Sequence, residues 1–587
     1  MTENGQPTAN TYQSFLLADC GHTTTTVILF DVVDGTFRFV AKGSATTTIA
    51  PPQADLSRGI RHAIEYIEEA THRTLLSKSG QLISPTNEDG QGVDFFGLTV
   101  SATEPLKGIV IGLANDLSVT NASQVLHSVY ASHRETFSVS DQRSAQRQID
   151  AIRFHRPDVI IIAGGTDGGA EEQVLQLVEI ASIGVQQLPP GERAQIIYAG
   201  NSALREAVKD SFANSTIVHM ANNINPRPQT VQTSDAKRVM QDIFQTIRVN
   251  RLPGMSALGT WLTKTPQATM SAVATVCQYL ATVTQGRVLT VDVGSNTVSL
   301  IEATAEEVET AIFADLGVGV PINNLLRYTS AEHILRWVPD PNPDKPIKEE
   351  NLVIELHNMS LFPKTIPATP KRLRLLQGIL RELIHYVVNE TGRLHGWPIG
   401  RVPQTDLLIL RGNSLIGMPR PAQAILTVLD ATQPTGTFAV AMDEHNVLPA
   451  VGYLAQEQPV AAVQILENGV LTDLGWVVVL NGQGSIGDDA LKITIEIEGA
   501  DKLEQEVLWG SLTVIPLAAG VQAQVTLKPE RLFDVGNGAG KKKTLTVHGG
   551  EVGLVIDARG RPLPIYTETD SEQQHTAVLQ WIWDMGG

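Results

Sequence analysis

The feature that most constrains the fold is a strand–turn–strand pattern that occurs twice in the chain. Phe15 to Asp31 reads FLLADCGHTTTTVILFD, in which an apolar run ends at Asp19, a short turn follows, and a second apolar run begins at Val27. Val288 to Glu302, VLTVDVGSNTVSLIE, repeats this order with Asp292 near the end of its first run. Apolar runs joined by a short polar turn predict β-hairpins. Two such hairpins, more than a domain's length apart, predict a duplicated fold with one turn in each half.

The residue types in both turns suit the phosphates of a nucleotide. Glycine lets the backbone approach a ligand closely, and hydroxyl and amide groups donate hydrogen bonds to phosphate oxygens. Asp19 and Asp292 are predicted to hold waters of a Mg²⁺ shell, and Asp292 also to orient an attacking water. Taken alone, the first turn is equally well explained as an ordinary hairpin with a polar turn. The predicted phosphate-binding residues are Gly21, Thr23, Thr24, Gly294, Asn296 and Thr297.

Two further glycine-rich turns follow buried strands. The apolar run 159–162 leads into AGGTDGG, where Gly164, Gly165 and Asp167 are candidate ligand contacts, with a helix cap by Asp167 as the alternative. The run 406–410 leads into Gly412, Asn413 and Ser414, which we expect near the nucleotide base. Each half of the chain then has a hairpin followed by a strand with a glycine-rich end. This arrangement resembles the fold of actin, sugar kinases and heat-shock ATPases, in which the nucleotide lies between two lobes.

Four segments in order give a more specific resemblance: AGGTDGG, RGNSLIGMPRPAQAILTVLDATQPTG from Arg411, AMDEHNVLPAVGYLA from Ala441 and GLVIDARGRPLPIY from Gly553. Together they resemble the glutamate-mutase-associated family called GlmL or MutL, which is unrelated to the mismatch-repair protein. The resemblance covers nearly the whole chain. It implies ATP and Mg²⁺ as ligands and a chaperone or reactivating role beside an adenosylcobalamin-dependent mutase.

The sequence departs from that family's pattern near the predicted phosphates. Ser295 stands where the family has a second glycine, Ser299 where it has a later aspartate, and Asn413 where it has a glycine. The first phosphate turn is intact. The resemblance therefore supports nucleotide binding, whereas the missing carboxylate argues against hydrolysis.

The predicted fold class is α/β, with two ribonuclease-H-like ATPase lobes and a C-terminal all-β domain. We expect the lobes at residues 1–284 and 285–468. From about Gly469 the sequence changes to short strands separated by glycine-rich turns, which predicts a β-sandwich or barrel over 469–587. Within it, Asp557, Arg559 and Arg561 form either a partner-binding or lobe-contacting charge cluster or a structural turn with Asp557 paired to Arg559.

Composition excludes several classes of protein. A chain of 587 residues with 42% hydrophobic and 18% charged residues is globular and too long for one core. Its formal charge of −18 argues against a nucleic-acid partner. The chain contains no apolar run long enough to span a membrane and opens with no secretory leader, so we expect a cytoplasmic protein. Its two cysteines make neither a disulfide framework nor a zinc site by themselves.

Three functions remain open on this evidence. The first is a chaperone-like ATPase that acts on a partner enzyme, and the second is a nucleotide-binding scaffold with little or no turnover. The third is a small-molecule kinase, which is weakest because no catalytic base lies in a convincing motif. The sequence leaves the oligomeric state open, a homodimer included.

Overall fold

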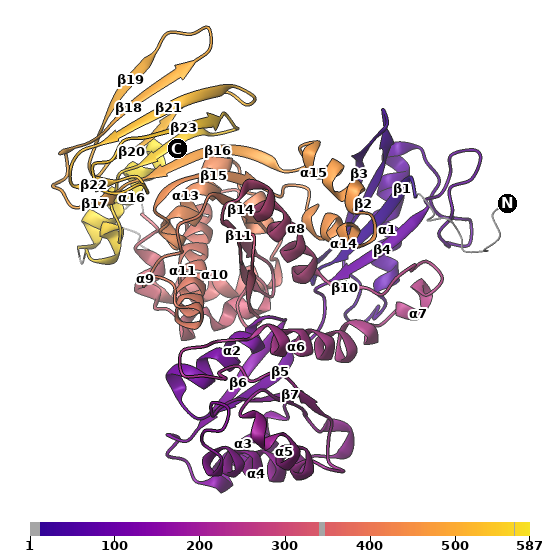
Figure 1. Cartoon of the computed structure of the whole chain (residues 1–587). Coiled ribbons are helices and arrows are strands. Elements are labelled where there is room, and N and C mark those ends of the chain that lie inside the picture. The colour runs from indigo at the N-terminus through magenta and orange to yellow at the C-terminus, as the bar shows by residue number, and fades with distance from the viewer. Residues whose placement is uncertain (1–11, 340–346, 569, 587) are drawn as a thin grey trace. The chain divides into compact units, whose positions relative to one another are not determined.

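The computed structural model describes residues 12–339, 347–568 and 570–586 (Figure 1). Contacts divide the chain into two compact units, each built from separate stretches of sequence. Unit 1 comprises Met1–Glu104, Gln245–Val276 and Asp443–Leu471. Unit 2 comprises Pro105–Phe244, Cys277–Met442 and Thr472–Gly587. In the described part of the chain, no helix is long and apolar enough to cross a membrane.

Unit 1 contains one five-stranded sheet of order β10-β4-β1-β2-β3. Strands β1, β2 and β3 are antiparallel neighbours, whereas β4 pairs parallel with β1 and β10 pairs parallel with β4. Ile60, Ala63, Ile64 and Ile67 form the buried stripe of helix α1, which packs on the sheet. The elements are β1 (Ser14–Cys20), β2 (Thr24–Val33), β3 (Thr36–Thr46), α1 (Leu56–Thr71), β4 (Phe95–Val100), β10 (Gln267–Ala268), α14 (Leu448–Glu457) and α15 (Pro459–Glu467).

Unit 2 repeats this strand order in the first part of its large sheet, β13-β12-β11-β14-β15. Strands β11 to β13 are antiparallel neighbours, β14 is parallel to β11, and β15 is parallel to β14. When the strands of each unit are numbered along the chain, they lie side by side in the order third, second, first, fourth, fifth in both units. The predicted duplication is confirmed, and the chain has the α/β fold of actin-like ATPases. The elements are β11 (Val288–Val293), β12 (Val298–Ala303), β13 (Val308–Phe313), α10 (Glu349–Leu361), α11 (Pro370–His395), β14 (Leu407–Arg411), α12 (Asn413–Ile416), α13 (Pro421–Thr432) and β15 (Gly436–Met442).

Between β4 and β10 the chain forms a separate, wholly parallel sheet of order β6-β5-β7-β8-β9 (Figure 1). Helices α3, α4 and α5 pack in sequence against one another, whereas α2 packs against β5, β6, β13 and α11. This inserted sheet was not predicted. The elements are β5 (Leu106–Gly112), α2 (Thr120–His127), β6 (Ala131–Ser138), α3 (Ala145–His155), β7 (Val159–Ile162), α4 (Glu172–Gln186), β8 (Gln195–Tyr198), α5 (Arg205–Ser211), β9 (Val218–Met220) and α6 (Ser234–Ile247). Helix α8 (Thr269–Thr284) lies outside this insertion, between β10 and β11.

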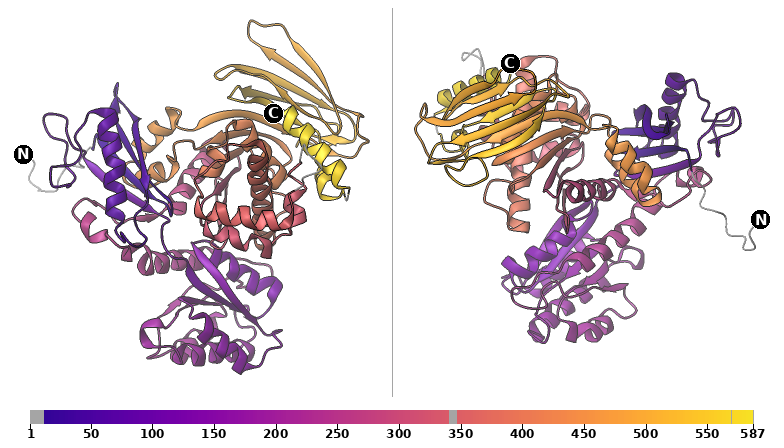
Figure 2. Two further views of the ribbon diagram at one scale, coloured as in Figure 1. Left: turned by 180° about the vertical axis from the view of Figure 1, so that it is seen from behind. Right: turned by 45° about the horizontal axis from the view of Figure 1, so that its top comes forward.

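The C-terminal strands form a β-sandwich that shares a sheet with the second lobe (Figure 2). Strand β16 pairs with β15 and continues the large sheet through β24 and β20. A four-stranded sheet, β19-β18-β21-β23, packs on these strands through one hydrophobic core. Helix α16 (Ser571–Asp584) was not predicted. The strands are β16 (Thr472–Val479), β18 (Asp489–Ile497), β19 (Leu503–Leu508), β20 (Leu512–Ile515), β21 (Gln522–Pro529), β23 (Lys543–His548) and β24 (Gly553–Asp557).

The inserted sheet and the second lobe meet at a buried histidine, which predicts acid sensitivity. His127 Nδ1 lies 3.2 Å from the carbonyl oxygen of Ile312, and its ring centroid lies 4.7 Å from that of Phe313. Burial, aided by the nearby His133, lowers the pKa of His127 to about 4. The unfolded histidine titrates near 6.5, so only the unfolded chain gains this proton between pH 6.5 and 4. The free energy of unfolding therefore decreases as the pH falls from 6.5 to 4. We expect the titration of His127 to lower the free energy of unfolding by about 3 kcal/mol over this pH range.

His127→Asn keeps a side-chain donor for Ile312 but removes the titration. Urea unfolding of this variant at pH 7.5 and pH 5 is therefore expected to depend less on pH than unfolding of the wild type. The exposed His357→Asn serves as the matched control in the same unit and should leave the pH dependence unchanged. An equal pH dependence in His127→Asn and wild type would contradict the assignment.

Candidate functional site

The first hairpin turn places Asp19 at the end of β1 with only neutral hydrogen-bond donors around it. Its carboxylate accepts from Thr99 Oγ1 at 2.8 Å, Thr269 Oγ1 at 2.7 Å and Asn446 Nδ2 at 3.1 Å. These donors come from β4, the start of α8 and the loop before α14. The side chain is 8% exposed, and no cation in the described ranges forms an ion pair with it. The carboxylate is thus oriented without its charge being neutralised.

The turn itself is closed by a backbone hydrogen bond from Gly21 N to Thr24 O at 2.9 Å. The segment after β4 lies against it, because the amides of Ser101 and Ala102 both donate to Cys20 O at 3.0 Å. Burial lowers the pKa of His22, whose Nε2 lies 3.0 Å from Thr103 O. The predicted residues Gly21, Thr23 and Thr24 therefore lie on one turn with Asp19 beside it.

The second hairpin has the same geometry. Gly294 N donates to Thr297 O at 2.8 Å, as Gly21 does to Thr24, and Asp292 precedes Gly294 by the same two positions as Asp19 precedes Gly21. The turn that carries Asn296 is covered by Gly319, whose amide donates to Ser295 O at 2.7 Å. A Cβ at Gly319 would lie 2.8 Å from that oxygen, so glycine permits the approach. The equivalence of the two turns supports their interpretation as a duplicated pair.

The two sites differ in charge. Arg411, on β14, is the register partner of Asp292 on β11, and in unit 1 the partner of Asp19 in the equivalent strand is Thr99. Arg411 Nη1 forms an ion pair with Asp292 Oδ2, and the two side chains are 3% and 10% exposed. A carboxylate compensated in this way is a poor choice for a second magnesium ligand. Sequence reasoning missed Arg411, because only the strand register brings it to Asp292.

The predicted residues after β14 lie beside this hairpin. Gly412 has φ +96°, and a Cβ there would lie 2.2 Å from Val293 O, so a glycine is required for β14 to end against β11. Asn413 and Ser414 then begin α12, and Gly412 O accepts from the amides of Leu415 and Ile416. The structure thus brings Gly412, Asn413 and Ser414 to the Asp292 hairpin, and their place near the nucleotide base stays a prediction.

The AGGTDGG turn does not follow the counterpart of β14, which corrects the equivalence of the two glycine-rich strand ends expected from the sequence. Its strand, β7, lies in the inserted parallel sheet, and the true counterpart of β14 in unit 1 is β4, which pairs parallel with β1. Gly164 and Gly165 lie at the carboxyl edge of that sheet, where a 2-1-3-4-5 strand order places ligand sites. Hydrogen bonds from Asn223 Nδ2 and Ser202 N lower the pKa of Asp167. Asp167 therefore joins neighbouring loops of the inserted sheet.

The first hairpin suits a magnesium ion that is bound together with phosphates and waters, and not a metal ion held by protein side chains alone. Among the residues that the structure describes, no three His, Cys, Asp or Glu side chains are grouped to hold a metal. Mg²⁺ usually keeps several waters and binds through one or two carboxylates together with substrate phosphates. The oriented and uncompensated carboxylate of Asp19 meets that requirement.

Comparisons with known proteins agree with the sequence resemblance. Protein MutL of Clostridium tetanomorphum is 25% identical over 292 residues, which are 48% of this chain and 56% of the relative. The chain therefore matches only about half of that relative's length.

Solved structures with low overall similarity include nucleotide-free acetone carboxylase, at 10% identity over 84% of this chain and 81% of that one with a TM-score of 0.30. A nucleotide-free diol dehydratase-reactivating factor has 9% identity over 78% and 99%, also with a TM-score of 0.30. Component A of (R)-2-hydroxyglutaryl-CoA dehydratase from Acidaminococcus fermentans has 9% identity over 76% and 99%, with a TM-score of 0.29. The fold assignment rests on the repeated strand order rather than on these scores. Since the family model described as MutL protein matches residues 15–470, the chain belongs to the glutamate-mutase-associated MutL family, as the sequence predicted.

Proposed function

We propose that this chain binds Mg²⁺–ATP through its two hairpin turns and serves as a nucleotide-dependent assembly or reactivating factor for a partner enzyme. The partner class we propose is an adenosylcobalamin-dependent mutase. The observation that carries the proposal is the equivalence of the two turns: an aspartate at the strand end, a Gly N–H to Thr O hydrogen bond, and a parallel strand ending beside each. Bound Mg²⁺ would neutralise phosphate charge.

In this proposal each group of residues has a distinct task. Asp19 holds the Mg²⁺ shell from unit 1, because its three donors orient it while leaving its charge uncompensated. Thr23, Thr24, Asn296 and Thr297 hydrogen-bond phosphate oxygens. Gly412 to Ser414 lie near the base.

A second candidate, a nucleotide-binding scaffold with little hydrolysis, is favoured by the surroundings of Asp292. Its ion pair with Arg411 occupies the carboxylate that would otherwise orient an attacking water. Ser299, the register partner of Asp292, has a buried hydroxyl with no hydrogen-bond partner among the described residues. Phosphate release from ATP, measured with and without an adenosylcobalamin-dependent mutase holoenzyme, separates the two. Release stimulated by the mutase supports the ATPase, whereas nucleotide binding without release supports the scaffold.

Asp19→Ala tests nucleotide binding directly. Removing the magnesium-side carboxylate is expected to weaken Mg²⁺–ATP binding about 10- to 100-fold, or about 1.4–2.7 kcal/mol, as measured by titration calorimetry on the full chain. Glu65→Ala is the matched control, because it removes one exposed carboxylate from α1 of the same unit. Unchanged affinity in Asp19→Ala, or an equal loss in Glu65→Ala, would count against the assignment.

A further inference from the structure

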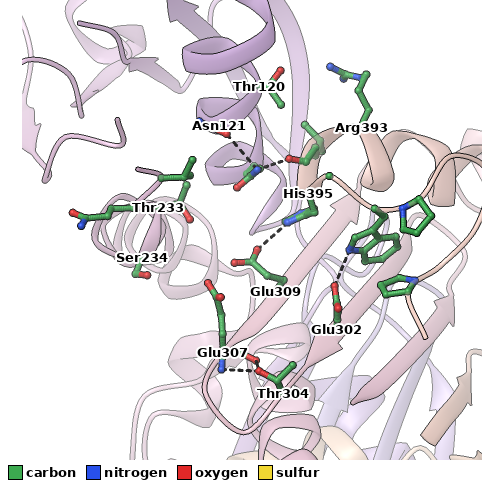
Figure 3. Close-up of a pocket in the computed structure, with 18 of the residues that line it drawn as sticks. Thr120, Asn121, Thr233, Ser234, Glu302, Thr304, Glu307, Glu309, Arg393 and His395 are labelled. Carbon is green, nitrogen blue, oxygen red and sulfur yellow. Dashed lines mark hydrogen bonds and ion pairs between the residues drawn. The ribbon is translucent and has the colours of Figure 1, made fainter. Parts of the chain in front are cut away.

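Unit 2 contains two cavities that differ in their chemistry. In the larger, of about 1,050 Å³, side chains of the wall bind one another. Glu309 Oε2 lies 3.2 Å from His395 Nδ1, and Trp397 Nε1 donates to a carboxylate oxygen on β12 at 2.7 Å (Figure 3). The smaller, of about 350 Å³, lies where the starts of α11 and α13 meet the end of α16, and we call it the α16 cavity. Its volume is within the range of small-molecule sites.

The wall of the α16 cavity is mostly apolar. Leu426 of α13 and Met585, just after α16, are 3% and 6% exposed and belong to the hydrophobic core of the lobe. Ile582 of α16 packs against that core and also lines the cavity. Three prolines, at positions 367, 370 and 419, contribute further apolar surface. Such a wall favours a ligand with an apolar body.

Gln377, on α11, is a buried polar side chain in this apolar wall. It is 5% exposed, and its amide has no hydrogen-bond partner among the described residues. Unlike the unpartnered hydroxyl of Ser299, this amide is not shut off from solvent. Buried polar groups nearly always have partners. Because Gln377 lines the cavity, a polar group of a ligand would supply the partner that the protein does not.

Arg374, one turn before Gln377 on the same face of α11, gives the cavity a positive charge. In the described part of the chain it forms no ion pair, and its Nη1 makes one long hydrogen bond, 3.4 Å, to Pro339 O. A guanidinium has five N–H donors, so most of these remain available. No Asp or Glu occurs among the described lining residues, although the chain carries a formal charge of −18. The cavity therefore suits an anion.

Gln423, on α13, adds a donor from another helix. Its Oε1 accepts from the amide of Arg420 at 3.4 Å, so its Nε2 is the end of the side-chain amide that remains without a partner within the described ranges. Donors from α11 and α13 thus line one cavity whose remaining wall is mostly apolar. A carboxylate accepts several hydrogen bonds and matches the planar guanidinium of arginine.

We propose that the α16 cavity binds a small carboxylic acid with an apolar body, such as a medium-chain fatty acid. The carboxylate accepts from Arg374 and from the amides of Gln377 and Gln423, and the apolar body lies against the apolar wall. A phosphate monoester is the poorer occupant, because its charge of about −2 would face one cation. None of the residues proposed to bind nucleotide lines this cavity, so the site does not depend on the nucleotide function.

The test is titration calorimetry of the full chain with sodium octanoate, sodium acetate and octylammonium chloride as separate probes. Saturable binding is expected for octanoate alone, because acetate lacks the apolar body and octylammonium carries the wrong charge. Arg374→Gln is expected to weaken octanoate binding about tenfold. Arg372→Gln is the matched control: it removes an equal charge from the start of the same helix, but Arg372 pairs with Glu355 at 3.0 Å and does not line the cavity. Its octanoate affinity should equal that of the wild type.

Gln377→Glu is a second and independent test. It places a carboxylate one turn from Arg374 inside the cavity, where it competes with the ligand for the guanidinium and repels the ligand's charge. Octanoate binding is expected to be lost at pH 7.5, with urea unfolding curves to check that the variant folds.

Four results would overturn the proposal. One is no saturable binding of octanoate at millimolar concentration. Another is an equal loss of affinity in Arg374→Gln and Arg372→Gln, which would indicate general electrostatic attraction. A third is octylammonium binding as tight as octanoate binding, which would mean that the apolar wall alone attracts the ligand. The last is unchanged octanoate affinity in folded Gln377→Glu, which would place the carboxylate outside this cavity.

Discussion

Replacing Arg559 with methionine is expected to lower the free energy of unfolding of unit 2 by about 3–5 kcal/mol, because it leaves two buried carboxylates short of a cation. Arg559 is fully buried, and its guanidinium lies 2.8 Å from Asp430 on one side and 2.8 Å from Asp557 on the other. The guanidinium also lies 4.6 Å from the ring centroid of Trp581 on α16. One side chain thus connects α13, the end of β24 and the C-terminal helix.

The ion-pair network around it is continuous. Asp430 also pairs with Arg381 of α11 at 2.8 Å, and Asp557 pairs with Arg561 at 2.7 Å. Burial raises the pKa of Asp557, but the charges of Arg559 and Arg561 outweigh burial, so this pKa lies well below its usual range. The structure has both the Asp557–Arg559 pair and the lobe contact that the sequence left open, because Arg559 also pairs with Asp430 of α13. The residues are buried in the lobe and hold the C-terminal segment to it.

Because the chain has more than one unit, a single melting temperature would mix transitions. We therefore expect the loss in Arg559→Met as a shift to lower urea concentration of the tryptophan fluorescence transition and as faster proteolysis of the C-terminal strands. Arg531→Met, at an exposed position of the same region, should shift neither. A wild-type urea transition in Arg559→Met would show that the network contributes little net stability.

The hairpins could be predicted from the sequence because their information is local. In each, an apolar run, an Asp-x-Gly turn and a second apolar run occupy fewer than about twenty residues, and adjacent antiparallel strands pair directly. The same holds for the strands after Gly469, which are short and separated by glycine-rich turns.

The sequence alone does not distinguish the strands of the inserted sheet from the strands of the lobes. Strand β7 with AGGTDGG and strand β14 with RGNS have the same appearance, a buried apolar run ending in glycine. What distinguishes them is the strand beside each: β5 and β8 for β7, and β11 and β15 for β14. Strand β4, FFGLTV, was overlooked, although its apolar run before Ser101 and Ala102 was the local signal that could have found it.

The ion pair between Arg411 and Asp292 at the second hairpin could not be predicted for a similar reason. Arg411 and Asp292 are 119 positions apart, and only the parallel register of β11 and β14 makes them neighbours. In the sequence, Arg411 is simply the last residue of a strand. Register between distant strands is set by the packing of the whole sheet.

Replacing Arg411 with methionine is expected to destabilise unit 2 by about 3–5 kcal/mol, because it leaves the Asp292 carboxylate buried without its cation. Urea unfolding followed by tryptophan fluorescence measures the loss. At lower pH the unpaired carboxyl can bind a proton, so the loss should shrink as pH falls. Arg372→Met is the control, since its ion pair with Glu355 at 3.0 Å is on the surface, where such pairs contribute about 0–1 kcal/mol.

The double variant Asp292→Asn/Arg411→Met separates loss of the pair from loss of packing. With both charges gone, no buried carboxylate remains unpaired, and most of the stability is expected to return. If the double variant is as unstable as Arg411→Met, the guanidinium acts through its packing and not through its charge.

The same pair predicts unequal roles for the two aspartates in nucleotide binding. Asp19 has only neutral donors as partners, whereas the charge of Asp292 is already compensated by Arg411. Asp292→Asn is therefore expected to change Mg²⁺–ATP affinity less than threefold, against the 10- to 100-fold loss expected in Asp19→Ala, a difference of about 0.7 kcal/mol or more. Calorimetry of both variants under one buffer condition decides this. A larger loss in Asp292→Asn than in Asp19→Ala would mean that Arg411 leaves the carboxylate when nucleotide binds, and that Asp292 is the principal magnesium-side group.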